Sequence, residues 1–271
     1  MKTICFFLHY APTGNVPLYV IHYLQELIQF FDEVWLVSHQ KNLKLPERLN
    51  RVKLVRVANE GYDFGKFYSC IRTIKLEDYS KIACINDSNV LLSGLAPVFS
   101  WAENQDTGFW GLIDSSEKPW FSSHTNNYHI QSHFLVFNQP AIALLPEFFN
   151  SIDIATIIKE KDPKKLRRMV INDWEIGLSQ FMITKDIQGE SFIHSNMLQK
   201  KYGRKIKNAT FDLYAELITE GYPLIKKKVI IKETNWKRVL TGRRKLYHII
   251  KQYSLPERDI EKAIAEIVST R

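Results

Sequence analysis

The chain contains few of the residues and patterns that define several large protein classes. Its three cysteines, Cys5, Cys70 and Cys84, are odd in number, far apart and set mostly among apolar residues. They argue against a disulfide framework or a zinc site, and they are typical of reduced core thiols in a cytoplasmic protein. No apolar run approaches the ~20 residues of a membrane-spanning helix.

Several catalytic and targeting signatures are also missing. There is no G-x-S-x-G motif of a serine hydrolase, no G-x-x-x-x-G-K-[ST] phosphate loop and no dinucleotide-binding fingerprint. The apolar run within Met1–Tyr10 is too short for the core of a signal peptide, so we expect it to form the first strand. We find no internal repeat and no low-complexity segment.

What the chain does have is an ordinary globular composition with an uneven charge. Of its 271 residues, 45% are apolar and 24% are charged, which is enough for a sizeable core. From Lys200 onward there are 18 Lys and Arg against 8 Asp and Glu, a net charge of +10, which leaves −2 for the preceding residues. Anionic lipid headgroups, a polyanionic substrate or a solvated basic face would each account for this segment. Nucleic acid is disfavoured, since no recognised binding module accompanies the charge.

Short apolar runs alternate with helical patterns along the chain. This alternation predicts an α/β fold with a mainly parallel sheet flanked by helices. Because no linker is evident, we expect a main domain of residues 1–199 with a basic helical C-terminal appendage, residues 200–271, packed on it. The predicted strands are residues 4–8, 33–38, 51–57, 81–85, 109–113, 130–138 and 191–194, and the predicted helices are residues 15–31 (capped by Asn15), 67–74, 141–149, 173–183 and 257–268.

The most informative motif is Asn86-Asp87-Ser88, which ends the apolar run of residues 81–85. A carboxylate at the end of a buried strand is costly without a partner, and ligands bind at that edge of open α/β sheets. One carboxylate with neutral oxygens beside it can hold a divalent cation such as Mg²⁺ or Mn²⁺ that phosphates also bind, which makes Asp87 a candidate metal ligand. An Asx-turn that caps the next segment is an equally good interpretation.

A second motif, Asn59-Glu60-Gly61-Tyr62-Asp63-Phe64-Gly65-Lys66, lies between a predicted strand and a predicted helix, with residues 59–65 predicted as a loop. Two glycines permit close approach of the backbone to a ligand, and the start of the next helix offers N–H groups to a diphosphate. Lys66 would add a positive charge, and Tyr62 or Phe64 would stack on a base. A glycine-rich turn capped by Asp63 explains the same residues without any ligand.

Two further groups of residues are candidates for contact with sugars or for proton transfer. His129, Gln131 and His133 share one face of a predicted strand, where they suit sugar hydroxyls or form a polar solvent face. Asp173 and Glu175 lie at a predicted helix start, where carboxylates often serve as caps. Glu175 is a candidate general base if it projects into a cleft.

Six short motifs in order carry a resemblance to a known family. The series resembles that of the rhamnan-synthesis protein F family, glycosyltransferase-like proteins of bacterial cell-surface polysaccharide assembly. The similarity spans roughly residues 1–240. The motifs are G-Y-D-F-G-K (61–66), I-N-D-S-N (85–89), W-G-L (110–112), H-I-Q-S-H-F-L-V-F (129–137), W-E-I-G-L-S (174–179) and G-Y-P-L-I-K (221–226).

The resemblance implies a GT-A-like fold and an inverting transfer from a nucleotide-sugar donor. It implies that Asn86, Asp87 and Ser88 occupy the place of the Asp-x-Asp motif, although Asp87 is the only acid there. It further implies that His9, Tyr10 and Ser38 approach the nucleotide, with Asn59, Gly61, Tyr62, Asp63, Gly65 and Lys66 also on the donor. Glu175, with Asp173 second, would be the base, and Trp110, His129 and Gln131 would contact sugars.

The leading hypothesis is therefore a glycosyltransferase, with rhamnose as a candidate sugar. The acceptor would be a glycan or lipid-linked glycan, and the basic appendage would hold the enzyme on the anionic inner face of the plasma membrane. A carbohydrate-binding or assembly protein on a transferase fold is the alternative from another class. A sugar-phosphate nucleotidyltransferase is a third, disfavoured because the glycine-rich N-terminal loop is missing.

Overall fold

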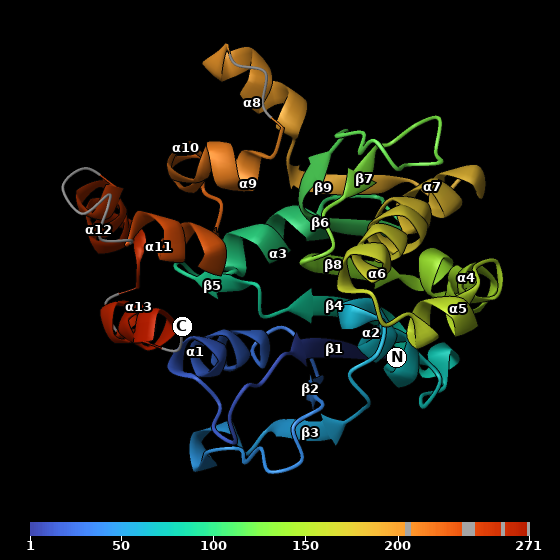
Figure 1. The fold of residues 1–271 in the computed structure, drawn as a ribbon, viewed down its shortest axis with the longest axis horizontal. Helices are drawn as coiled ribbons and strands as arrows, with labels where there is room; N and C mark the ends of the chain where they lie inside the picture. Colours follow the sequence, from blue (N-terminus) through green and yellow to red (C-terminus); the bar gives the residue numbers. More distant parts are fainter. Residues whose placement is uncertain (204–206, 235–241, 256–257, 270–271) are drawn as a thin grey trace.

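The computed structural model describes residues 1–203, 207–234, 242–255 and 258–269. A central sheet with the strand order β3-β2-β1-β4-β8-β6-β7 runs through the molecule, and β9 pairs with β6 (Figure 1). The strands are β1 (Lys2–His9), β2 (Glu33–Ser38), β3 (Val52–Arg56), β4 (Tyr79–Asn86), β6 (Phe109–Ser115), β7 (His129–Ile130), β8 (Phe134–Asn138) and β9 (Gly189–Ile193).

The sheet is mixed but mostly parallel. The strands β1 to β4 are all parallel, β9 is parallel to β6, and the antiparallel β8 joins β4 to β6. A separate two-stranded sheet pairs β5 (Asn89–Leu91) with β10 (Leu224–Lys226). The predicted α/β fold class with its mainly parallel sheet is therefore confirmed.

Helices cover both faces of the sheet because its central strands are apolar on both sides. On β1, Cys5 and Phe7 face one core cluster, whereas Ile4, Phe6 and Leu8 face the other. The first cluster includes residues of α1 (Leu18–Leu27) and α3 (Ala96–Glu103), and the second those of α2 (Tyr62–Ile71), α4 (Gln139–Asn150) and α7 (Gly177–Thr184). The shorter helices of this part of the chain are α5 (Ile154–Lys159) and α6 (Pro163–Met169), with single turns at Glu47–Leu49 and Leu76–Asp78.

The segment after residue 200 is built into the first core cluster. Its helices α12 and α13 contribute apolar side chains to the same cluster as β1, and the backbone N–H of Leu18 donates to Glu266 Oε2 at 2.8 Å. The predicted boundary between residues 199 and 200 falls inside α8. None of the described helices is both long enough and apolar enough to cross a membrane. The helices are α8 (Ser195–Tyr202), α9 (Ala209–Asp212), α10 (Tyr214–Thr219), α11 (Lys227–Glu233), α12 (Gly242–Tyr253) and α13 (Ile260–Ser269).

Several local predictions are corrected by the structure. Asn15 does not cap the first helix, because α1 begins after Pro17 and Asn15 instead forms a parallel bridge with Lys44. The second half of the predicted loop at residues 59–65 is helical, because Gly61 adopts a φ of +62° and lets α2 begin at Tyr62. The helix predicted at residues 67–74 therefore starts earlier and ends at Ile71.

Two other predicted elements are also different. The strand predicted for residues 130–138 is broken, since β7 ends at Ile130 and β8 begins at Phe134. Asp173 is not at a helix start: α6, a π-helical segment Val170–Ile176 and α7 follow one another without a break. Glu257, the first residue of the predicted terminal helix, lies outside the described residues, and α13 begins at Ile260.

Candidate functional site

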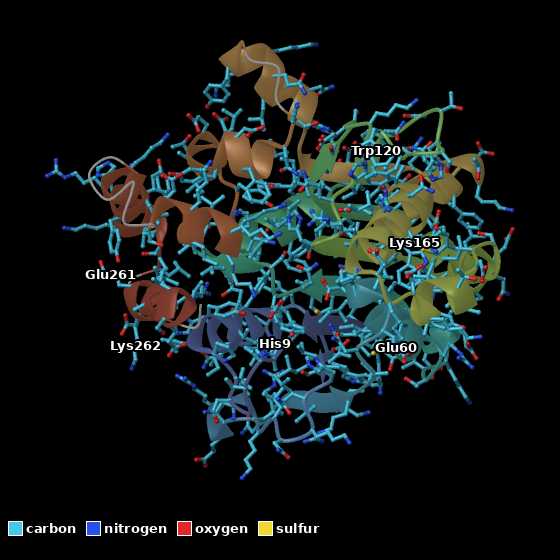
Figure 2. The ribbon with its side chains drawn as sticks, viewed as in Figure 1. His9, Glu60, Trp120, Lys165, Glu261 and Lys262 are labelled. Carbon is cyan, nitrogen blue, oxygen red and sulfur yellow. The ribbon has the colours of Figure 1, made fainter. Side chains whose placement is uncertain are left out.

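The site lies where β1 and β4 end side by side. His9 is the last residue of β1 and is labelled in Figure 2, and Asp87 directly follows β4. His9 Nδ1 is 2.5 Å from Asp87 Oδ2, and the hydroxyl of Tyr19 donates to the same oxygen at 3.2 Å. Lys227 Nζ is 3.4 Å from that oxygen and donates to the Tyr19 hydroxyl at 2.9 Å. The buried carboxylate of Asp87 therefore has three partners, which offset the free-energy cost of its burial.

These partners keep Asp87 ionised although it is buried. Burial alone would raise the pKa of this carboxyl, but the hydrogen bond from His9 and the positive charge of Lys227 more than offset it, so the pKa is lowered. Burial and the neighbouring Asp87 charge raise the pKa of Tyr19, so its phenol stays protonated and can donate. The result is a fixed negative charge at the sheet edge, paired with Lys227.

The two neighbours of Asp87 form the Asx-turn that the sequence offered as an alternative. Asn86 Oδ1 accepts hydrogen bonds from the backbone N–H of Ser88 at 3.1 Å and from its hydroxyl at 2.5 Å. The turn therefore engages Asn86 locally. Asp87 and Ser88 also line the cavity described next, so the turn and the site share residues.

A cavity of about 530 Å³, here called the central cavity, opens at this edge of the sheet. Its wall combines four basic side chains with three carboxylates, so it suits a ligand that carries both phosphates and hydroxyl groups. The lining residues are Asp87, Ser88, Ser115, Glu117, Pro119, Phe121, His129, Gln131, Arg167, Ile171, Glu175, Asn208, Phe211, Lys226, Lys227 and Lys228.

Glu175 faces this cavity and Asp173 does not. The hydroxyl of Ser132 donates to Glu175 Oε1 at 2.9 Å, and the carboxylate also borders a smaller cavity of about 290 Å³ beside α2. Asp173 Oδ1 accepts from the side-chain amide of Asn172 at 2.6 Å, and the residue lies outside those that line the described cavities. The π-helical turn places Glu175 in the cavity wall while Trp174 is fully buried. Such turns are frequent at functional sites.

Two more cavities adjoin the central one. A cavity of about 570 Å³, the apolar cavity, is lined mainly by apolar surface between the loop after β1 and α13, and it shares Lys227 and Lys228 with the central cavity. A polar cavity of about 510 Å³, the outer cavity, shares Ser115, Glu117 and Gln131 with it on the other side. The central cavity therefore lies between the other two cavities. It meets the apolar cavity at the two lysines and the outer cavity at Ser115, Glu117 and Gln131.

The residues predicted near the nucleotide are divided between the surface and the interior. Tyr10 is 55% exposed, stacks on His39 with ring centroids 5.1 Å apart and lines the apolar cavity. His9 is fully buried and reaches the site only through Asp87. Ser38 is also fully buried, and its hydroxyl accepts from the N–H of Gln40 at 3.3 Å.

The Asn59–Lys66 segment is mostly structural in this arrangement. Lys66 is 1% exposed, and its ammonium is 3.4 Å from Asp63 Oδ1, so it does not reach the central cavity. Gly65 is required by packing, because a Cβ there would stand 1.8 Å from the carbonyl oxygen of Glu60. Asn59 is exposed, and Tyr62 and Asp63 border only the small cavity beside α2.

Of the residues predicted to contact sugars, some line the central cavity and others are buried in the interior. His129 and Gln131 line the central cavity, whereas buried His133 has Nε2 2.5 Å from the hydroxyl of Tyr222. Burial lowers the pKa of His133 well below its usual range, so it is neutral there. Trp110 is a correction: it is 1% exposed and packs against Phe134 in the core, because β6 is covered on both faces and has no solvent side.

The sequence did not single out the basic residues of the cavity wall. Lys226 is the most unusual of them, since burial lowers its pKa to about 8, against a smaller opposing effect of Glu175. Among the described residues it has no carboxylate within ion-pair distance, and its ammonium lies 4.7 Å from the ring centroid of Phe211. The signal that could have found it is the Lys226-Lys227-Lys228 run, which begins with the last residue of the motif G-Y-P-L-I-K (221–226).

The donor set near Asp87 fits a divalent cation poorly. Within residues 1–203, 207–234, 242–255 and 258–269, no three His, Cys, Asp or Glu side chains are grouped to hold a metal. Asp87 Oδ2 already faces the Lys227 ammonium, and Asn86 Oδ1 is engaged by Ser88. A cation such as Mg²⁺ prefers several oxygen ligands at about 2.0–2.1 Å, and an ammonium beside one of them repels it.

The similarity of this chain to known structures is weak, both in sequence and in fold. A nucleotide-diphospho-sugar transferase from Desulfovibrio desulfuricans G20 is 10% identical, with a TM-score of 0.42, and the alignment covers 94% of this chain and 100% of that one. A glucose-1-phosphate thymidylyltransferase from Bacillus anthracis is 8% identical, with a TM-score of 0.42, over 71% of this chain and 87% of that one. At this level of similarity they carry no argument about function.

The sequence comparisons are more specific. Comparison with curated proteins found no match. The family described as "Rhamnan synthesis protein F" matches residues 36–257, which include Asp87, Glu175 and the lysine run of the cavity wall. The match extends over most of the chain and confirms the resemblance of the six motifs. The chain belongs to the rhamnan synthesis protein F family.

Proposed function

We propose that this protein is a glycosyltransferase that moves a sugar from a nucleotide-sugar donor to a growing cell-surface glycan. The observation that carries the proposal is the central cavity, whose wall sets Lys226, Lys227, Lys228 and Arg167 against the carboxylate of Glu175. Family membership supports a role in polysaccharide synthesis and makes rhamnose the first sugar to test.

The order of the three cavities suits the order of base, diphosphate and sugar in a nucleotide sugar, with the acceptor beyond the sugar. The apolar cavity suits a nucleobase, and Tyr10 at its edge offers an exposed aromatic face for stacking. Lys227 and Lys228, which belong to both cavities, suit the diphosphate. The central cavity then takes the sugar, with His129 and Gln131 in its wall to bind hydroxyl groups, and the outer cavity takes the acceptor.

Glu175 is the base in the proposed reaction. Its carboxylate is held by the Ser132 hydroxyl at 2.9 Å and also faces the cavity, so it can accept a proton from an acceptor hydroxyl. The hydroxyl oxygen attacks the anomeric carbon, and the nucleoside diphosphate leaves in a single displacement that inverts this carbon. Positioning of the two sugars and electrostatic stabilisation of the leaving group lower the barrier.

The experiment is a panel of nucleotide sugars, including dTDP-rhamnose, incubated with the protein and a lipid-linked glycan acceptor. We expect release of a nucleoside diphosphate with one donor and a loss of about 10²–10⁴-fold in Glu175→Gln, the usual contribution of a general base. Asp173→Asn is the matched control, because it removes a nearby carboxylate outside the cavities and should retain activity. No release with any donor, or full activity in Glu175→Gln, would refute the proposal. Release of pyrophosphate from a nucleoside triphosphate would indicate a nucleotidyltransferase instead.

We further propose that the acceptor is lipid-linked and that the enzyme works at the anionic cytoplasmic face of the membrane. The net charge of +10 after residue 199 supports this, and α12 contributes exposed Arg244, Lys245 and Lys251. Each basic residue near an anionic surface contributes about 1 kcal/mol. Replacing these three by glutamine should therefore weaken binding to anionic vesicles by about 100-fold. Equal binding of wild type and variant would refute this part of the proposal.

A further inference from the structure

Lys227 places a positive charge directly beside Asp87, the carboxylate that the sequence offers as a candidate metal ligand. Its ammonium lies 3.4 Å from Asp87 Oδ2 and 2.9 Å from the Tyr19 hydroxyl, and it also lies 4.9 Å from the centroid of the Tyr19 ring. The Lys227 side chain is 25% exposed, so it is held in place and still reachable from the cavities. The positive charge beside Asp87 is thus supplied by the chain itself.

The backbone also fixes Lys227 to the turn that carries Asp87. The N–H of Lys227 donates to the carbonyl of Ser88 at 3.0 Å, and the preceding residue, Lys226, pairs with Asn89 between β10 and β5. Two segments more than a hundred residues apart in the chain are therefore joined at this point. The protein holds this charge in place before the ligand arrives. A charge placed in advance stabilises a transition state without any reorganisation of the site during the reaction.

From this arrangement we propose that Lys227, aided by Lys228, supplies the positive charge at the leaving diphosphate, so that donor binding needs no divalent cation. The inference rests on the proposed function and names the charge that this function needs. Lys227 and Lys228 are the two residues common to the central and apolar cavities, where the diphosphate joins the sugar to the nucleoside. Asp87 is then a positioning residue that holds Lys227.

The chemical step balances with these residues alone. The acceptor oxygen forms a bond to the anomeric carbon, and its proton passes to the Glu175 carboxylate. The bond between that carbon and the diphosphate oxygen breaks, and its electron pair stays on the oxygen. The diphosphate gains one negative charge in this step, and the ammonium groups of Lys227 and Lys228 neutralise it where it develops.

The test is the binding of dTDP and of UDP to the full-length protein by isothermal titration calorimetry, in a chelator and then with Mg²⁺ or Mn²⁺. We expect the dissociation constant of the bound nucleotide to change by less than about twofold between these conditions. Lys227→Met should weaken binding by about 10–100-fold, the range for loss of a charge-assisted hydrogen bond. Lys227→Arg, which keeps the charge, should recover most of the affinity. Lys232→Met, which removes an exposed lysine of the same helix, is the control and should bind as wild type does.

A second readout uses only the wild-type protein, so it remains informative even where the Lys227 variants fold poorly. The electron paramagnetic resonance signal of free Mn²⁺ should fall no further with protein and dTDP together than with dTDP alone. Binding that appears only with a metal, additional uptake of Mn²⁺, or wild-type affinity in Lys227→Met would each overturn the inference and leave the proposed function standing. Absence of binding of both nucleotides under every condition would overturn the inference, whereas the proposed function falls only if no donor of the nucleotide-sugar panel releases its nucleoside diphosphate.

Discussion

Removing the charge of Lys226 by the substitution Lys226→Met is expected to stabilise the folded protein and to weaken its binding of phosphates. The methionine side chain matches the lysine stem in length and leaves out the ammonium. The pKa of Lys226 is lowered from 10.5 to about 8, mainly by burial. Folding therefore places a charged group where its charged form is disfavoured.

The size of the effect follows from the pKa. Each pKa unit corresponds to about 1.4 kcal/mol, so burying this charge costs up to about 3 kcal/mol at pH 7. Loss of the contact between the ammonium and the Phe211 ring removes about 0.5–1 kcal/mol. Partial solvent access of this half-buried residue reduces the first figure further. We expect Lys226→Met to unfold with a free energy about 1–2 kcal/mol larger than that of the wild type.

The pH dependence provides the stricter test. Below about pH 8 the wild-type lysine is charged in both states, so the full gain of the variant is present. Between about pH 8 and 10.5 the folded protein has lost this proton while the unfolded chain still binds it, so the wild type becomes more stable relative to Lys226→Met. The difference between them should shrink over this range.

The measurement is urea unfolding of the wild type and Lys226→Met at a series of pH values. Lys232→Met is the control, since it removes an exposed lysine from the adjacent helix α11 and should change stability by less than about 0.5 kcal/mol. A variant that is less stable than the wild type at pH 7 would refute the reasoning. So would a difference that is the same at every pH, because it could not arise from the proton on Lys226.

The remaining predictions concern packing and the attachment of the C-terminal segment. Trp110→Ala should lose about 3–5 kcal/mol of unfolding free energy, because its ring is 1% exposed in the core. Trp120→Ala, at an 83% exposed position labelled in Figure 2, should change stability by less than about 0.5 kcal/mol in the same urea titration. Glu26→Ala leaves the Arg258 guanidinium buried without its partner and should cost about 3–5 kcal/mol. Equal stability of both tryptophan variants, or a Glu26→Ala midpoint like that of the wild type, would contradict the burial on which these figures depend.

The elements that could be predicted from the sequence are those with short, strongly apolar runs. The strands at residues 4–8 and 33–38 have such runs, and they appear as β1 and β2. Asp87 was identifiable because a carboxylate directly after a buried strand needs a partner, and its partners are present. Glu175 was placed in the wrong helical context but on the correct side of the fold, since it does face the cavity.

The rest depended on contacts between distant parts of the chain. The contact of Trp110 with a sugar is implied only by the family resemblance, and no local pattern around Trp110 reveals that β6 is covered on both faces. Lys66 looked like a ligand for phosphate because a lysine after a glycine-rich turn is usually exposed, whereas here α2 turns it inward toward Asp63. Lys227 was counted only as net charge, because the pairing of β10 with β5 that brings it to Asp87 cannot be read from either segment alone.

The pairing of β10 with β5 also ties the completion of the site to the order of synthesis. On a ribosome, the segment with Asp87 emerges long before residues 224–226, so the early chain can form β1 to β4 while the lysine wall is still missing. The last strand must then close a loop of more than a hundred residues, an entropic cost that has to be met by the packing of α11 and α13. A nascent or truncated chain that ends before residue 226 therefore has the carboxylates and Arg167 of the central cavity but none of its three lysines.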